Sequence, residues 1–286
     1  MKKTTKFLLL GMTMVSISCA KDEAQKNDVE TLQPNDVVEL IVSNPARYIQ
    51  DKSGVEKLMA DLHLTDEQQQ ICYQEQQLAE QLVAKQNTKA KHALVKNVIE
   101  ERSGEEEVVT ADVFSGLSEL MIAYADVKGI SEHWQSAFGD FVTGVGAIVE
   151  KIEGSSIVVD VDNLLQKEFG VLKKEMLEKY ALTELDKLQL TTMADNTHLL
   201  ISNILKDDSM VYGASSSAKR LQKGWLKDFV KVVTQKIVFS VSIVVGAAVG
   251  LYVCSPCVVC AKLCAGAGAI AGAYIGGKLV DEIAKW

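Results

Sequence analysis

Residues 237–277 read IVFSVSIVVGAAVGLYVCSPCVVCAKLCAGAGAIAGAYIGG, and the two apolar runs in this stretch set the architecture of the chain. The first arm carries no charge up to position 253, and the second, 257–277, carries one charge, at Lys262. Ser255 and Pro256 are the expected turn, because proline lacks the amide hydrogen and clashes with the preceding helical turn. Each arm is near the roughly 20 residues needed to cross a hydrocarbon core. The stretch therefore predicts an apolar helical hairpin.

Small residues recur at every fourth position in both arms. They are Gly246 and Gly250 in the first arm, and Gly268, Gly272 and Gly276 in the second. This spacing stacks small residues along one helix face, so two backbones can approach closely. The glycines predict tight packing between helices, either within a membrane or in the buried core of a water-soluble bundle. A sheltered hairpin that inserts later would combine both states.

The hairpin tip holds a run of four cysteines whose spacing is that of a bacterial ferredoxin cluster site. Two observations argue against a cluster: Ala265 replaces the usual proline, and an exported chain normally crosses the membrane unfolded. Disulfides are the favoured interpretation for an exported protein, and four cysteines permit three pairings. Buried free thiols are the remaining alternative. No cofactor is expected. The candidate disulfide residues are Cys254, Cys257, Cys260 and Cys264.

A basic amphipathic segment precedes the first arm. Trp225 begins one apolar face, while Lys227 and Lys231 share the opposite face. Such a helix suits the interface of an anionic membrane. A surface helix packed on the rest of the protein is the alternative.

Charge divides the chain into two parts. Residues 221–286 carry seven lysines against three acidic residues, a net charge of +4, so with −8 for the whole chain residues 1–220 carry −12. Only three prolines and seven phenylalanines occur, which favours helix over sheet. The shift in charge predicts a boundary near the Ser-rich stretch 213–217.

Helical periodicity covers most of the acidic part. Thr65 is the expected N-cap of a long helix, with Gln68 as its capping-box partner, and Gly129 is the expected terminator of a later helix. The predicted fold class is all-α, a helical bundle with a C-terminal Gly-rich hairpin. The expected helices span 66–101, 110–128, 131–153, 161–180 and 183–205.

The sequence contains no motif that indicates catalysis, a bound metal or nucleic acid. The four histidines have no metal-ligand spacing, and neither a nucleophile elbow nor a phosphate-binding loop occurs. We therefore expect a protein that is not an enzyme.

The N-terminus has the form of a secretory signal. Lys2, Lys3 and Lys6 precede a short apolar run, and small residues lead to Cys19. This resembles the lipobox of bacterial lipoproteins, although Ser16 stands where leucine is usual. The charged residues 21–23 that follow resemble the surface-export signal of Bacteroidota lipoproteins. The resemblance implies a chain lipidated at Cys19 and exposed on the outer membrane.

The apolar hairpin resembles that of colicin-type pore-forming toxins in length, lack of charge and central turn. Together with the N-terminus, the chain resembles the lipoprotein bacteriocins of Bacteroidota, which permeabilise competing cells. That class implies processing by an Arg-specific protease, for which Arg102 and Arg220 are the candidate sites. It also implies a target membrane, an immunity protein, a receptor and assembly into homo-oligomers. The alternative is a non-toxic structural or binding lipoprotein whose hairpin is a second anchor or a buried core.

Five segments are expected on this interpretation. They are a signal peptide at 1–18, a lipid-anchored tether at 19–34, an acidic helical body at 35–212, a linker at 213–224 and a cationic hairpin domain at 225–286.

Overall fold

The computed structural model describes residues 37, 40, 47, 54–86, 110–154, 161–206, 225–254 and 261–283. These ranges contain eight α-helices and no strand, so the predicted all-α class is confirmed. The helices are α4 (Gly54–Asp61), α5 (Asp66–Gln86), α7 (Thr110–Val127), α8 (Glu132–Gly154), α9 (Val161–Lys179), α10 (Glu184–Lys206), α12 (Trp225–Cys254) and α13 (Ala261–Ile283).

Capping boxes begin two of the helices. At α5 the Thr65 amide donates to Gln68 Oε1 at 2.9 Å, and the Gln68 amide donates back to Thr65 Oγ1 at 3.3 Å. This confirms the predicted start of the long helix. Thr183 and Asp186 exchange the same pair of bonds, at 2.9 and 3.1 Å, before α10. Each box satisfies amides that have no partner within the helix.

A glycine turn joins α7 to α8. Gly129 has a φ of 73°, a left-handed conformation that glycine adopts without steric cost. Its amide donates to the Asp126 carbonyl at 2.9 Å, and the Ile130 amide reaches the Ala125 carbonyl at 3.2 Å. Ser131 Oγ then accepts from the Trp134 amide at 3.3 Å. Gly129 therefore follows the end of α7, as predicted, and the chain turns so that α8 packs along α7.

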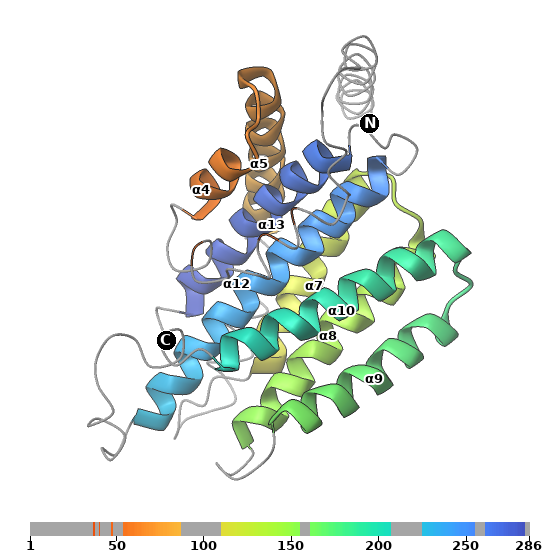
Figure 1. The fold of residues 1–286 in the computed structure, drawn as a ribbon, viewed down its shortest axis with the longest axis vertical. Coiled ribbons are helices and arrows are strands. Elements are labelled where there is room, and N and C mark those ends of the chain that lie inside the picture. The colour runs from red at the N-terminus through yellow and green to blue at the C-terminus, as the bar shows by residue number, and fades with distance from the viewer. Residues whose placement is uncertain are drawn as a thin grey trace.

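The apolar hairpin α12–α13 lies in the middle of the bundle (Figure 1). α12 packs on α7, α8 and α10, while α13 packs on α4, α5 and α7. α9 packs outside these on α8 and α10. The pair α4–α5 and the helix α9 thus form opposite edges of the molecule (Figure 1).

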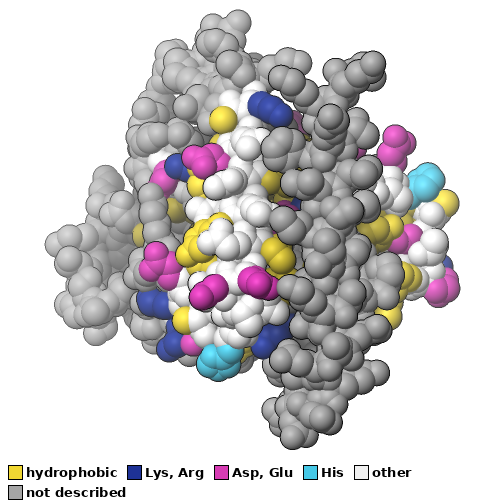
Figure 2. All heavy atoms as spheres, turned by 90° about the horizontal axis from the view of Figure 1, so that it is seen from above, with side chains coloured by type: hydrophobic (Ala, Val, Ile, Leu, Met, Phe, Trp, Pro, Cys, Tyr) yellow, Lys and Arg dark blue, Asp and Glu magenta, His cyan; other side chains and the backbone are white. Residues whose placement is uncertain are grey.

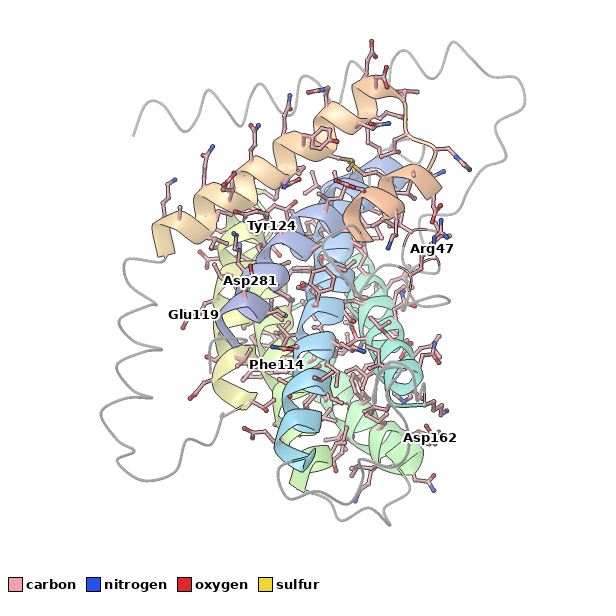
Figure 3. The ribbon with its side chains drawn as sticks, turned by 90° about the vertical axis from the view of Figure 1, so that its left-hand side faces the viewer. Arg47, Phe114, Glu119, Tyr124, Asp162 and Asp281 are labelled. Atoms are coloured by element: carbon pink, nitrogen blue, oxygen red, sulfur yellow. A yellow bond between two sulfur atoms is a disulfide. The ribbon has the colours of Figure 1, made fainter. Side chains whose placement is uncertain are left out.

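Large aromatic side chains fill the core on the α7–α8 side of the hairpin. Trp134, Phe138 and Tyr252 form one aromatic cluster. The Trp134 ring centroid lies 5.4 Å from that of Phe138 in a stacked pair and 5.3 Å from that of Tyr252 in a tilted pair. Phe114 lies in the interior between α7 and its neighbours (Figure 3). Gly146 of α8 admits it, since a Cβ there would lie 2.6 Å from Phe114 Cβ. The hairpin is thereby embedded in the hydrophobic core.

Several predicted features lie outside the described residues. They include Cys19, Arg102, Arg220, Ser255 and Pro256. The signal, tether and linker segments also lie outside, as does the predicted long helix beyond 86. The proposed segment boundaries therefore stay predictions.

Candidate functional site

The contact between α12 and α13 is built on glycine. A Cβ on Gly246 would lie 2.1 Å from the carbonyl oxygen of Gly268, and a Cβ on Gly268 would lie 2.1 Å from that of Gly246. A Cβ on Gly250 would lie 1.9 Å from the Cys264 carbonyl oxygen. A Cβ atom cannot lie this close to a carbonyl oxygen. The two backbones can therefore approach this closely only because these residues have no side chain.

Ser242 continues the same contact away from the tip. A Cβ on Gly272 would lie 2.0 Å from the Ser242 carbonyl oxygen, and one on Gly276 would lie 2.0 Å from Ser242 Oγ. The structure thus brings all five predicted glycines into one interface. Glycine spacing alone misses Ser242 and Cys264. Counting serine and cysteine as small residues finds both, because Ser242, Gly246, Gly250 and Cys254, and likewise Cys264, Gly268, Gly272 and Gly276, are spaced by four.

Both hairpin helices are apolar and long enough to cross a membrane, yet the bundle covers them. The candidate spans are Val232–Cys254 and Ala261–Asp281, with 78% and 67% of their most apolar windows buried. A core helix of a soluble protein passes the same test of length and composition. Burial is nearly complete from Val241 to Val249. The hairpin in this structure is therefore sheltered by the other helices.

Buried hydroxyl groups in α12 bond within their own helix. Ser240 Oγ donates to the Lys236 carbonyl at 2.6 Å, and Ser242 Oγ donates to the Phe239 carbonyl at 2.6 Å. Such bonds leave the hydroxyl satisfied whether the helix faces protein or lipid. These two serines thus need no partner from another helix.

The charged residues of the hairpin lie near its ends. Lys262 is the second residue of α13, and Lys278 lies in its last turns with Nζ 5.3 Å from the Tyr274 ring centroid. At about 1.5 Å per residue, the uncharged runs 237–254 and 263–277 span about 27 and about 22 Å. A lysine near a helix end can extend its ammonium group to the water boundary. The charges therefore do not prevent the arms from entering lipid.

A disulfide joins the two arms near the tip. It pairs Cys254 with Cys264, whose Cα atoms are 6.2 Å apart. The sequence left the pairing of the four cysteines open, and the structure has this one bond. Cys257 and Cys260 lie outside the described residues. Iron–sulfur clusters are held by thiolates. In this disulfide, neither Cys254 nor Cys264 is a thiolate.

Helix α5 covers α13 with a narrow stripe of small and aliphatic side chains. Its buried residues are Cys72, Ala79, Leu82 and Val83. Cys72 joins Met59 of α4 and three α13 side chains in a separate apolar cluster, whose α13 members are Leu263, Ala267 and Ile270. Eight of the 21 residues of α5 are glutamine, so the rest of the helix is largely polar.

A polar contact ties α5 to α7. Tyr124 of α7 points toward α5, where its hydroxyl donates to Glu75 Oε2 at 2.9 Å (Figure 3). Lys128 forms an ion pair with the other Glu75 oxygen. Burial, followed by the nearby Glu75 charge, raises the pKa of Tyr124 well above its usual value. The same two causes raise the pKa of Cys72 to about 12, so this free thiol stays protonated at neutral pH.

The basic segment and the first apolar arm form one continuous helix. α12 runs for 30 residues from Trp225, so the positions of Lys227 and Lys231 lie in its first two turns. The side chains of 225–231 lie outside the described ones. The membrane-facing role of these three residues stays a prediction.

In the described ranges no three His, Cys, Asp or Glu side chains gather in a way that could hold a metal ion. Hydrophobic side chains on the face in Figure 2 lie in small groups among charged and other polar ones. Comparisons with protein-family models, curated proteins and solved structures found no match to this chain.

Proposed function

We propose that this protein is a surface lipoprotein bacteriocin that permeabilises the membranes of competing bacteria through its α12–α13 hairpin. The observation that carries the proposal is the combination of membrane-length apolar helices with a glycine interface, sheltered inside a bundle. The length and apolarity of the arms suit passage into lipid, where their close glycine packing would hold them together. The bundle would keep the arms soluble until a target membrane is reached.

Interactions within the hairpin support its transfer as a unit. Its closest contacts, Gly246 with Gly268 and Gly250 with Cys264, lie between the two arms. The disulfide at the tip is internal to the pair as well. Helix association in lipid depends on such close packing, because no hydrophobic effect drives it there. One hairpin cannot line an aqueous pore, so several copies would assemble.

The charge division supports a directed approach to the target. Residues 221–286 carry +4, and the basic residues are concentrated before the first arm. Basic residues beside an apolar helix gain roughly 1 kcal/mol each at an anionic membrane surface. The tail would dock on anionic headgroups before the arms insert.

The alternative is a non-toxic structural or binding lipoprotein of the envelope. The extent of burial favours it, since residues such as Val241, Val245 and Ala269 are fully covered and would form an ordinary core. On this interpretation the hairpin never leaves the bundle. The two functions differ in whether the protein harms a membrane.

Killing in co-culture tests the proposed function. Cells that display the protein are mixed with an otherwise identical strain that lacks it and any neighbouring immunity gene. We expect loss of the second strain, and we expect Cys19→Ala to reduce killing by removing the lipid. Survival of the target strain at normal surface abundance favours the structural alternative.

Processing is tested in the same assay with Arg102→Gln and Arg220→Gln. If cleavage at either residue activates the protein, the corresponding variant will be displayed normally and will not kill. Unchanged killing by the double variant removes cleavage from the account and leaves the hairpin as the active part.

A further inference from the structure

We propose that α4–α5 is a detachable cap, and that its departure exposes the face of α13 that first contacts the acyl chains of a target membrane. This inference rests on the proposed function. It assigns the opening of the shelter to one pair of helices, while α7, α8 and α10 stay packed on α12.

The two sides of the hairpin are held by different kinds of contact. Toward α8, Tyr252 of α12 packs against the buried Trp134 ring, whose centroid lies 5.3 Å away. Toward α4 and α5, none of the buried side chains of the cap is aromatic. They are Leu58, Met59, Leu62, Cys72, Ala79, Leu82 and Val83. Because hydrophobic stabilisation scales with the apolar area buried, small side chains hold a helix less firmly than aromatic ones. The cap side lacks the aromatic contacts of the α8 side, and we infer that it is the side that opens first.

Few polar contacts tie the cap to the rest of the bundle, and the one centred on Glu75 is the most buried, since Glu75 accepts from the buried Tyr124 hydroxyl. In the Glu75–Lys128 pair, only 18% and 19% of the two side chains are exposed. Arg47 and Asp61 form a bidentate contact at 2.7 and 2.8 Å at the end of α4, and the Arg47 side chain is 49% exposed (Figure 3). Water and salt can replace the exposed Arg47 pair, whereas the Glu75–Lys128 pair is screened much less. Opening of the cap therefore has to break the Glu75 contact, which makes Glu75 the polar residue to test.

The face beneath the cap is suited to lipid. Leu263, Ala267 and Ile270 follow one another at helical spacing along α13, and all three are buried by the cap cluster. Gly266 lies beside them, where a Cβ would be 2.9 Å from Leu62 Cδ1. This face carries no charge. It lies apart from the glycine interface with α12, so removing the cap leaves the hairpin itself intact.

The buried thiol of Cys72 reports opening of the cap. The test uses the full chain with Cys19→Ser, added to vesicles of phosphatidylglycerol and phosphatidylethanolamine. A thiol reagent is applied, and mass spectrometry follows labelling of Cys72 together with amide hydrogen exchange in α8. We expect Cys72 to be protected in solution and to become labelled on vesicles before α8 loses its protection.

Two variants weaken the cap directly. Ala79→Leu overfills a fully buried position on α5, and we expect labelling of Cys72 to be about tenfold faster. Glu75→Gln removes the ion pair without adding volume. Because it also removes a charge that raises the pKa of Cys72, its effect is measured by amide hydrogen exchange in α5, where we expect exchange to be about threefold faster. Both should leak vesicles faster than the unaltered chain. Leu165→Ala, in α9, is the matched control, since it destabilises an edge helix that packs on α8 and α10.

The possible results distinguish the proposal of a detachable cap from the proposed pore-forming function. Leakage while Cys72 stays protected, or equal effects of Ala79→Leu and Leu165→Ala, would overturn the cap and leave the proposed function standing. Rapid Cys72 labelling on vesicles that stay sealed would support the detachable cap and overturn pore formation.

Discussion

Glycine has different roles at different positions of α13, and the structure separates them. A Cβ at Gly268 or Gly272 would meet a backbone carbonyl oxygen of α12 at about 2 Å, whereas at Gly277 the nearest atom is Phe239 Cε2 at 3.6 Å. The first two positions need glycine because the backbones touch. At position 277 a side chain would fit, so the packing does not require glycine there.

Alanine substitutions at these positions should therefore differ sharply. We expect Gly246→Ala to lower the free energy of unfolding by about 3 kcal/mol or more, because the neighbouring backbone cannot move aside easily. Gly277→Ala should be neutral or stabilise by up to about 1 kcal/mol through helix propensity. Urea denaturation of both variants measures the difference. Equal midpoints would show that the two arms are not in close contact.

This geometry changes what a substitution such as Gly268→Leu reports. If the two arms packed together only within a membrane, this variant would lose activity and keep its abundance. Because Gly268 also packs against Gly246 inside the folded bundle, we now expect the variant to lose surface abundance as well.

The tip disulfide contributes to the stability of the resting bundle. It closes a loop with a sequence separation of 10 residues, and we expect Cys254→Ser with Cys264→Ser to cost about 2–3 kcal/mol. Denaturation of the double variant and of the unaltered chain, both without reductant, gives this value. A loss below about 0.5 kcal/mol would mean that the arms hold the tip without the bond.

Among the elements, the α9–α10 pair carries a titratable group whose protonation opposes folding. Burial lowers the pKa of His198, whose ring lies 5.2 Å from Phe169, although Asp195 and Asp162 act in the opposite direction. A histidine with a lowered pKa binds its proton more readily in the unfolded chain. Stability from this site is therefore present above the usual pKa of about 6.5 and falls as the pH drops below it.

Replacing the imidazole should reduce this sensitivity to acid. We expect His198→Gln to lose less stability between pH 7.5 and about pH 5.5 than the unaltered chain loses, whatever its stability at neutral pH. Thermal unfolding at several pH values measures the slope. Identical slopes would mean that His198 does not contribute.

Local sequence signals predicted the elements well. The Thr65–Gln68 box and Gly129 mark helix boundaries because their hydrogen bonds form within a few residues. The contact of α5 with α7 had no such signal, since Glu75 and Tyr124 are 49 residues apart and neither lies in a motif. The pairing of Cys254 with Cys264 was one of several that the spacing allowed.

Over the whole molecule, composition could not decide where the hairpin resides. A helix that fills a protein core and one that spans a membrane share length and apolarity. The structure shows the arms between α4–α5 on one side and α7, α8 and α10 on the other. The glycine spacing predicted that the arms touch, because that contact depends only on the arms themselves. Which helices cover the arms depends on packing between segments far apart in the sequence, which the spacing of glycines does not report.

The central position of the hairpin bears on the effect of a cut at Arg220. α12 would still pack on α7, α8 and α10, and α13 on α5. We therefore expect the cleaved protein to elute from size-exclusion chromatography as one complex in the absence of lipid. Anionic vesicles should then separate the two pieces. Spontaneous dissociation in buffer would show that the packing depends on the intact chain.

Dye release from anionic liposomes tests the central claim most directly. The chain from residue 20 onward is compared with the fragment 221–286 at equal concentration. Our account predicts rapid leakage by the fragment and much slower leakage by the longer chain, because the bundle shelters the hairpin. No leakage from either, across a range of salt and pH, would contradict it and make the hairpin a structural core.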